Sequence, residues 1–143
     1  MMIDVEHALE VADTAWENHG FDARALPPSL KVVHLIGWLD AAVAQGGVYG
    51  WLINSSGPHG PDTVTALETV GAHQCASIVR EILAFFPEGT PSFDDQTRVR
   101  QMEDIGEVGE RSWRDLGNRL LEWPDDIYAL LEKFIAEHEA DFA

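Results

Sequence analysis

The chain has few basic residues and almost no cysteine, and each shortage excludes a class of protein. Nine lysines and arginines stand against 25 aspartates and glutamates in 143 residues, which gives a formal net charge of −16. Surfaces that contact nucleic-acid phosphates or anionic lipids need the opposite sign. The lone Cys75 allows neither an internal disulfide nor a cysteine-based zinc cage. We therefore expect no direct binding to nucleic acid or membrane.

Long apolar runs and targeting signals are also missing. The longest apolar stretch, residues 32–39, is interrupted by His34 and Gly37 and is far shorter than the ~20 residues that cross a bilayer. The first six residues contain no basic group and no apolar core of signal-peptide length. Together with the unpaired cysteine, these features predict a cytoplasmic protein.

No motif identifies a nucleotide, metal or catalytic site. The glycines between residues 46 and 60 do not form a phosphate-binding pattern, and no lysine follows them. The six histidines include no HExxH pair. Cys75 lies in an apolar segment and is predicted to be a buried thiol. We therefore expect no metal and no cofactor, and we lean toward a protein that is not an enzyme.

Helical periodicity is what the chain does contain. A length of 143 residues favours one domain, and no segment alternates polar and apolar residues as an amphipathic strand would. We predict an all-α fold, a single compact domain of seven or eight helices over residues 1–143. The predicted helices, of which the first is strongly acidic, span about 3–19, 30–44, 48–54, 62–70, 73–86, 92–105, 110–122 and 124–138.

The acidic residues are concentrated at the two ends of the chain. Residues 1–22 contain six acids and no base, and residues 93–143 contain fourteen acids and six bases. In the first predicted helix four acids recur at spacings of 4, 3 and 4, which places them on one face. They span ~16 Å, or one charge per ~5 Å, against one phosphate per ~3.4 Å of a DNA strand. Two such helices side by side would approach the charge density of one DNA strand.

This charge exceeds what solubility requires. A net charge of magnitude ~2–8 keeps a small domain in solution, so a value of −16 favours an electrostatic partner. We predict an acidic partner-binding surface drawn from three groups. These are Glu6, Glu10, Asp13 and Glu17; then Asp125, Glu132 and Glu139; and then Glu103, Asp104, Glu107 and Glu110.

A glycine-rich motif in the nearly neutral middle of the chain carries a family resemblance. Residues 45–57, with the sequence QGGVYGWLINSSG, join a glycine pair to an aromatic stretch and an Asn-x-Ser-Gly ending. Over about residues 30–142 the chain resembles a bacterial family of domains of unknown function that is typified by an acidic DNA-mimic protein. It departs from that family at Gln45, where Asn is usual, at Val48, where Phe is usual, and at Gly117, where an acid is expected. We interpret the motif as structural, and its members are Gly46, Gly47, Tyr49, Trp51, Asn54, Ser56 and Gly57.

The resemblance implies an all-helical fold that often self-associates, so a homodimer is an expectation. It also implies a role in transcription regulation, through binding of a helix-turn-helix protein in place of DNA. Our first hypothesis is that the acidic surface binds the basic DNA-reading surface of a regulatory protein and blocks DNA access. Two alternatives stay open: a small enzyme or ligand-binding domain that uses loop 45–61, and an immunity-like inhibitor of a basic toxin.

Overall fold

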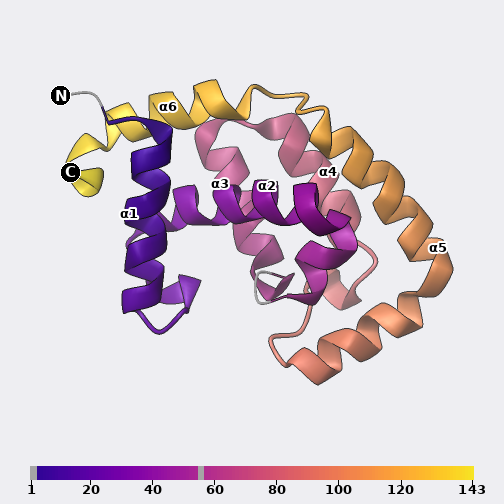
Figure 1. Ribbon diagram of the computed structural model, residues 1–143. Helices are drawn as coiled ribbons and strands as arrows, with labels where there is room; N and C mark the ends of the chain where they lie inside the picture. Colours follow the sequence, from indigo (N-terminus) through magenta and orange to yellow (C-terminus); the bar gives the residue numbers. More distant parts are fainter. Residues whose placement is uncertain (1–2, 55–56) are drawn as a thin grey trace.

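The computed structural model describes residues 3–54 and 57–143, and this part of the chain is helical without strands (Figure 1). Its six α-helices are α1 (Val5–Asn18), α2 (Pro28–Ile53), α3 (Gly60–Val70), α4 (His73–Leu83), α5 (Asp95–Leu121) and α6 (Ile127–Glu137). Short 3₁₀ turns accompany them: η1 (Ala23–Ala25), η2 (Gly57–His59), η3 (Pro87–Gly89) and η4 (Glu139–Phe142).

The predicted all-α class is confirmed, but the described residues form six helices rather than seven or eight. The predicted helices 30–44 and 48–54 are both parts of α2, and the helices 92–105 and 110–122 fall in α5. Each long helix contains one residue with left-handed φ, namely Gly47 (φ 67°) and Gly106 (φ 67°). Because glycine adopts this conformation without a steric penalty, each helix is kinked there and then continues.

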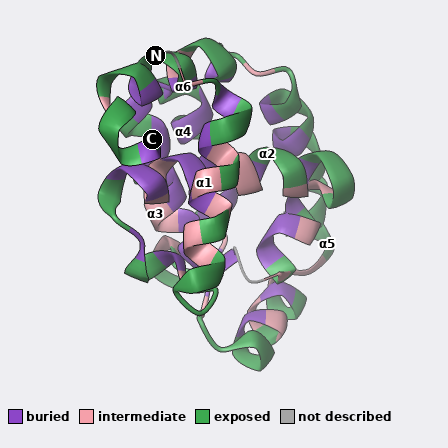
Figure 2. Ribbon diagram, turned by 60° about the vertical axis from the view of Figure 1, so that its left-hand side comes forward, coloured by how far each residue is buried: buried purple, intermediate pink, exposed green. Residues whose placement is uncertain are grey.

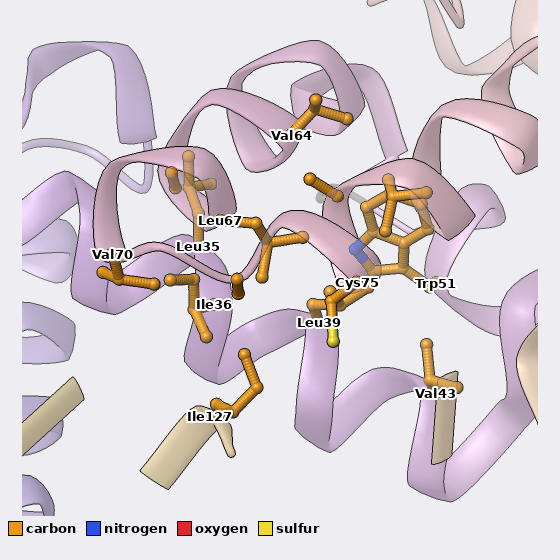
Figure 3. Packing of buried hydrophobic residues seen from close by; sticks show 14 of the residues in the cluster. Leu35, Ile36, Leu39, Val43, Trp51, Val64, Leu67, Val70, Cys75 and Ile127 are labelled. Atoms are coloured by element: carbon orange, nitrogen blue, oxygen red, sulfur yellow. The ribbon is translucent and has the colours of Figure 1, made fainter. Parts of the chain in front are cut away.

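Helix α2 lies at the centre of the molecule and contacts α1, α3 and α5 (Figure 1). Its sequence explains this position, because apolar residues surround most of its length and a helix of that kind is buried. Figure 3 shows Leu35, Ile36 and Leu39 of α2 in one core with Leu67 of α3 and Ile127 of α6. Each such side chain contributes ~1.5–3 kcal/mol on burial, so this core holds α3 and α6 against α2.

Two glycines allow helices to approach closely. At Gly37, where α1 crosses α2, a Cβ atom would lie 2.5 Å from Cδ2 of Leu9. At Gly117 of α5, a Cβ atom would lie 3.0 Å from Cγ2 of Val48. Val48 and Gly117 are also two of the positions at which the sequence departs from the family pattern. The two departures are thus in contact, and a larger residue at 117 would displace Val48.

Candidate functional site

Helix α1 lies on the outside of the molecule and has exposed segments along its length (Figure 2), and its acidic residues recur at the spacing of one helical face. Its opposite side packs against the core through Val5, Ala8 and Ala12. Three of its acids are exposed, and the fourth, Asp13, is half exposed. No lysine or arginine among the described residues pairs with any of them. We call this set the α1 face, and its members are Glu6, Glu10, Asp13 and Glu17.

Asp13 has an additional contact inside the protein. Its Oδ1 lies 3.0 Å from Nδ1 of His34, a buried residue of α2. The ring of Trp16 lies 5.0 Å from the rings of both His34 and Trp38. Asp13 therefore helps to hold α1 on α2, whereas the other three acids of the α1 face are open to solvent.

The C-terminal acids have different environments. Glu132 is exposed on α6, and Glu139 is exposed in η4; both elements contact α1. The carboxylate of Asp125 instead accepts hydrogen bonds from the backbone N–H of Cys75 at 2.8 Å and from Nε2 of Gln74 at 3.4 Å. A carboxylate in this place satisfies an N–H group in the first turn of α4 and complements the helix dipole. The carboxylate of Asp125 therefore stabilises a contact within the protein and is not assigned to the partner surface.

The acids of α5 lie away from the α1 face. Figure 1 shows α1 near one end of α2 and α5 near the other end. Within this group Glu107 pairs with Arg111 at 3.5 Å, and Arg100 and Arg114 lie on the same helix. The acids predicted from the sequence thus do not form one surface, and the exposed acids of α5 make a second one. We call the second one the α5 group, and its exposed members are Glu103, Asp104, Glu107 and Glu110.

An acidic groove runs along the crossing of α1 and α2. It consists of two cavities of about 660 and 440 Å³ that share Leu9, Gly37 and Asp40. No lysine or arginine among the described residues lines either cavity. The carboxylates that line the groove come from α1, from α2 and from the start of α6, and they are Glu6, Asp13, Asp40 and Asp126.

Two groove residues, Asp40 and Asp126, were not predicted from the sequence. Asp40 is the single acid between residues 23 and 61, and a charge that interrupts an otherwise apolar helix is the signal that could have identified it. Asp126 is the N-cap of α6, and its carboxylate accepts the N–H of Ala129 at 3.1 Å. Because the capping role alone accounts for an aspartate at this position, the sequence does not indicate that Asp126 also lines the groove.

Two other cavities offer less to a basic partner. One, of about 620 Å³, is lined by Arg24 and Lys31, but these bases pair with Asp22 at 3.0 Å and with Asp62 at 2.9 Å. The hydrogen bond to Arg24 also lowers the pKa of Asp22. The other, of about 320 Å³, lies between the Gly46–Gly47 turn and α5, with Tyr49, Glu110 and Arg114 in its lining. Neither cavity carries a surplus of acid.

Residues 45–53 of the glycine-rich motif form the end of α2, and this end is held by a residue that the sequence analysis did not single out. Arg98 is 1% exposed and donates hydrogen bonds to the carbonyls of Leu52 (2.9 Å), Ile53 and Asn54 (3.2 Å each). In the motif Trp51 is buried and Tyr49 is exposed, and a Cβ at Gly57 would collide with the Leu52 carbonyl. Ser56 lies outside the described residues. An arginine is almost always solvent-exposed, so its sequence position gave no indication of this role.

Neither a metal centre nor a membrane span is found in the part of the chain that the structure describes. No three or more His, Cys, Asp or Glu side chains are grouped there so as to hold a metal ion. No helix of residues 3–54 and 57–143 has both the length and the apolar character needed to cross a bilayer.

Comparison with known families identifies the chain. The model of the DMP19-like protein family matches residues 24–138, well over half of the sequence. No curated protein and no solved structure matches the chain. The matched range contains Asp40 and Asp126 of the acidic groove and all of the α5 group, whereas α1 precedes it. The chain belongs to the DMP19-like protein family, a family of DNA-mimic-like domains.

Proposed function

We propose that this protein is a cytoplasmic DNA mimic that binds the basic DNA-reading surface of a regulatory protein, such as a helix-turn-helix protein, and keeps DNA away from it. Membership of a DNA-mimic-like family supports the assignment to DNA-mimic proteins. The observation that carries the proposal is the α1 face, whose carboxylates have no lysine or arginine partner among the described residues. We assign the partner surface to α1, the acidic groove and Glu132, and not to the α5 group.

The physical basis is that carboxylates replace phosphates. Arginine and lysine side chains that contact DNA phosphates form the same charge-assisted hydrogen bonds with carboxylates. A net charge of −16 steers a basic partner toward the protein during diffusion. Because the Debye length is ~8 Å at physiological salt, this attraction weakens as salt is added. Binding should therefore be salt-sensitive and should compete with duplex DNA.

Capture from a bacterial lysate tests the proposal. The immobilised protein is exposed to lysate at low salt and is then eluted with duplex DNA or with a salt gradient. We expect recovery of a DNA-binding protein that duplex DNA displaces. A basic protein that only salt displaces would instead favour the immunity-like inhibitor.

Matched charge reversals locate the surface. The variant Glu10→Lys/Glu17→Lys changes two exposed acids of the α1 face and leaves the Asp13–His34 contact intact. The control Glu103→Lys/Asp104→Lys makes the same change in net charge on α5. We expect the first variant to lose the captured protein and the second to retain it. Equal capture by both variants would contradict the assignment to α1.

A further inference from the structure

We propose that the acidic groove is the docking site for a basic amphipathic helix of a protein partner. This inference rests on the proposed function and specifies which part of the acidic surface binds, and with what chemistry. The α1 face alone would attract any basic surface. The groove adds an apolar floor, so it selects a partner that presents apolar and basic residues together.

The first argument is the shape of the groove. The larger cavity, of about 660 Å³, lies within the range of roughly 300–1,000 Å³ that is typical of ligand-binding clefts. Because Gly37 has no side chain, Leu9 packs closely against α2, and the two residues line both cavities. The aliphatic part of the lining of the larger cavity consists of Leu9, which is half-buried, and of the buried residues Val5, Ile36, Ile127 and Leu131.

The second argument is the charge around this floor. Exposed carboxylates of Glu6, Asp40 and Asp126 line the larger cavity, and no described lysine or arginine lies among them. An amphipathic helix binds a groove through apolar residues spaced three or four apart and places its polar residues at the rim. Lysine or arginine at those rim positions would meet the three carboxylates. An acidic or neutral helix would leave them without a cationic partner.

The third argument is the pair of aromatic residues at one end of the groove. Tyr128 is 57% exposed although it lies next to the apolar floor. Trp123 lines the same cavity with a left-handed backbone (φ 47°), which is rare for a bulky residue. A lysine or arginine placed over such a ring gains a cation–π interaction. These rings therefore favour the same basic partner as the carboxylates do.

A pair of synthetic peptides tests the inference. The first peptide, of about 14 residues or four helical turns, places leucine on one face of a helix and lysine on the other. The second has the same length and charge but glutamine in place of each leucine. Isothermal titration with the intact protein should give an affinity for the leucine peptide at least about tenfold higher, because buried apolar anchors supply most of the energy of such interfaces.

Matched variants test the location. Asp40→Asn/Tyr128→Ser removes one carboxylate and one exposed ring from the groove. Asp104→Asn/Val108→Ser makes the corresponding changes on α5, where Val108 is 71% exposed. We expect the first variant to lose at least about tenfold in affinity for the leucine peptide and the second to bind it as the unmodified protein does. Circular dichroism and Tm confirm that both variants fold.

The outcomes separate this inference from the proposed function. Equal affinity for the two peptides, or equal binding by the two variants, would overturn the groove as a docking site. If lysate capture still yields a protein that DNA displaces, the proposed function stands without the groove. Self-association that Asp40→Asn/Tyr128→Ser abolishes, with no peptide binding, would assign the groove to a second copy and would also overturn the proposal.

Discussion

The carboxylate of Asp125 accepts a 2.8 Å hydrogen bond from the backbone N–H of Cys75. This bond joins the segment between α5 and α6 to the first turn of α4, some fifty residues earlier in the chain. By sequence Asp125 and Glu132 are equivalent, as two acids on the outer side of a predicted C-terminal helix. In the structure one caps a helix and the other faces solvent, so their replacement should have different consequences.

Replacing Asp125 with alanine should lower stability, whereas replacing Glu132 should not. Loss of a helix-capping carboxylate costs about 1 kcal/mol, which corresponds to a fall in Tm of roughly 2–4 °C for a domain of about 150 residues. Glu132→Ala removes an exposed charge and should change the free energy of unfolding by less than about 0.5 kcal/mol. Thermal unfolding followed by circular dichroism measures both, and an equal Tm for the two variants would contradict the capping role.

The buried thiol of Cys75 should be unreactive in the folded protein. Burial raises the pKa of Cys75 to about 11, and the thiolate is the reactive form. At pH 8 we expect no modification by iodoacetamide in buffer and complete modification in urea. The raised pKa also means that the unfolded chain ionises first, so this thiol lowers stability as the pH rises from about 9 toward 11. Urea unfolding should show a shallower pH dependence for Cys75→Ala over that range.

His59 should make the protein less stable in mild acid. It is buried beside Phe93, its Nδ1 has no hydrogen-bond partner among the described residues, and burial lowers its pKa. The unfolded chain therefore takes up a proton first, so this group lowers stability as the pH falls below about 6.5. The variant His59→Leu should lose stability more slowly between pH 7 and 5 in urea titrations. If the free energy of unfolding changed with pH in the same way for the unmodified protein and for His59→Leu, this role of His59 would be refuted.

Substitution of Arg98 should lower the stability of the protein more than most single substitutions do. Its guanidinium donates to three carbonyls at the end of α2, and Asp95 is an additional partner at 2.8 Å. Arg98→Ala leaves those carbonyls without their donor, which should cost about 3 kcal/mol. Arg100→Ala is the control, since Arg100 is exposed and its loss should cost less than about 0.5 kcal/mol. Similar urea midpoints for the two variants would refute the assigned role of Arg98.

Local patterns in the sequence predicted the helices, but the assembly of the site depends on contacts between distant residues. Apolar periodicity placed the helical segments, and the glycine pair at 46–47 marked the kink of α2. Spacing along α1 also indicated which acids share a face. It could not show that α5 lies across the molecule from α1, or that Asp125 meets Cys75. Asp40 and Asp126 join Glu6 in the groove because three elements converge there.

The crossing of α1 and α2 can be tested with two glycines of the same helix. Gly46→Ala and Gly37→Ala both remove a flexible residue from α2, and alanine in a helix is favoured by ~0.5–1 kcal/mol. Gly46 has open space around its Cβ position, so Gly46→Ala should stabilise the protein by about that amount. At Gly37 the new Cβ meets Cδ2 of Leu9 at 2.5 Å, so the Leu9 side chain must move and part or all of the gain should be lost. A lower Tm for Gly37→Ala than for Gly46→Ala, together with weaker binding of the leucine peptide, would show that this contact shapes the groove; equal stabilisation by both substitutions would contradict it.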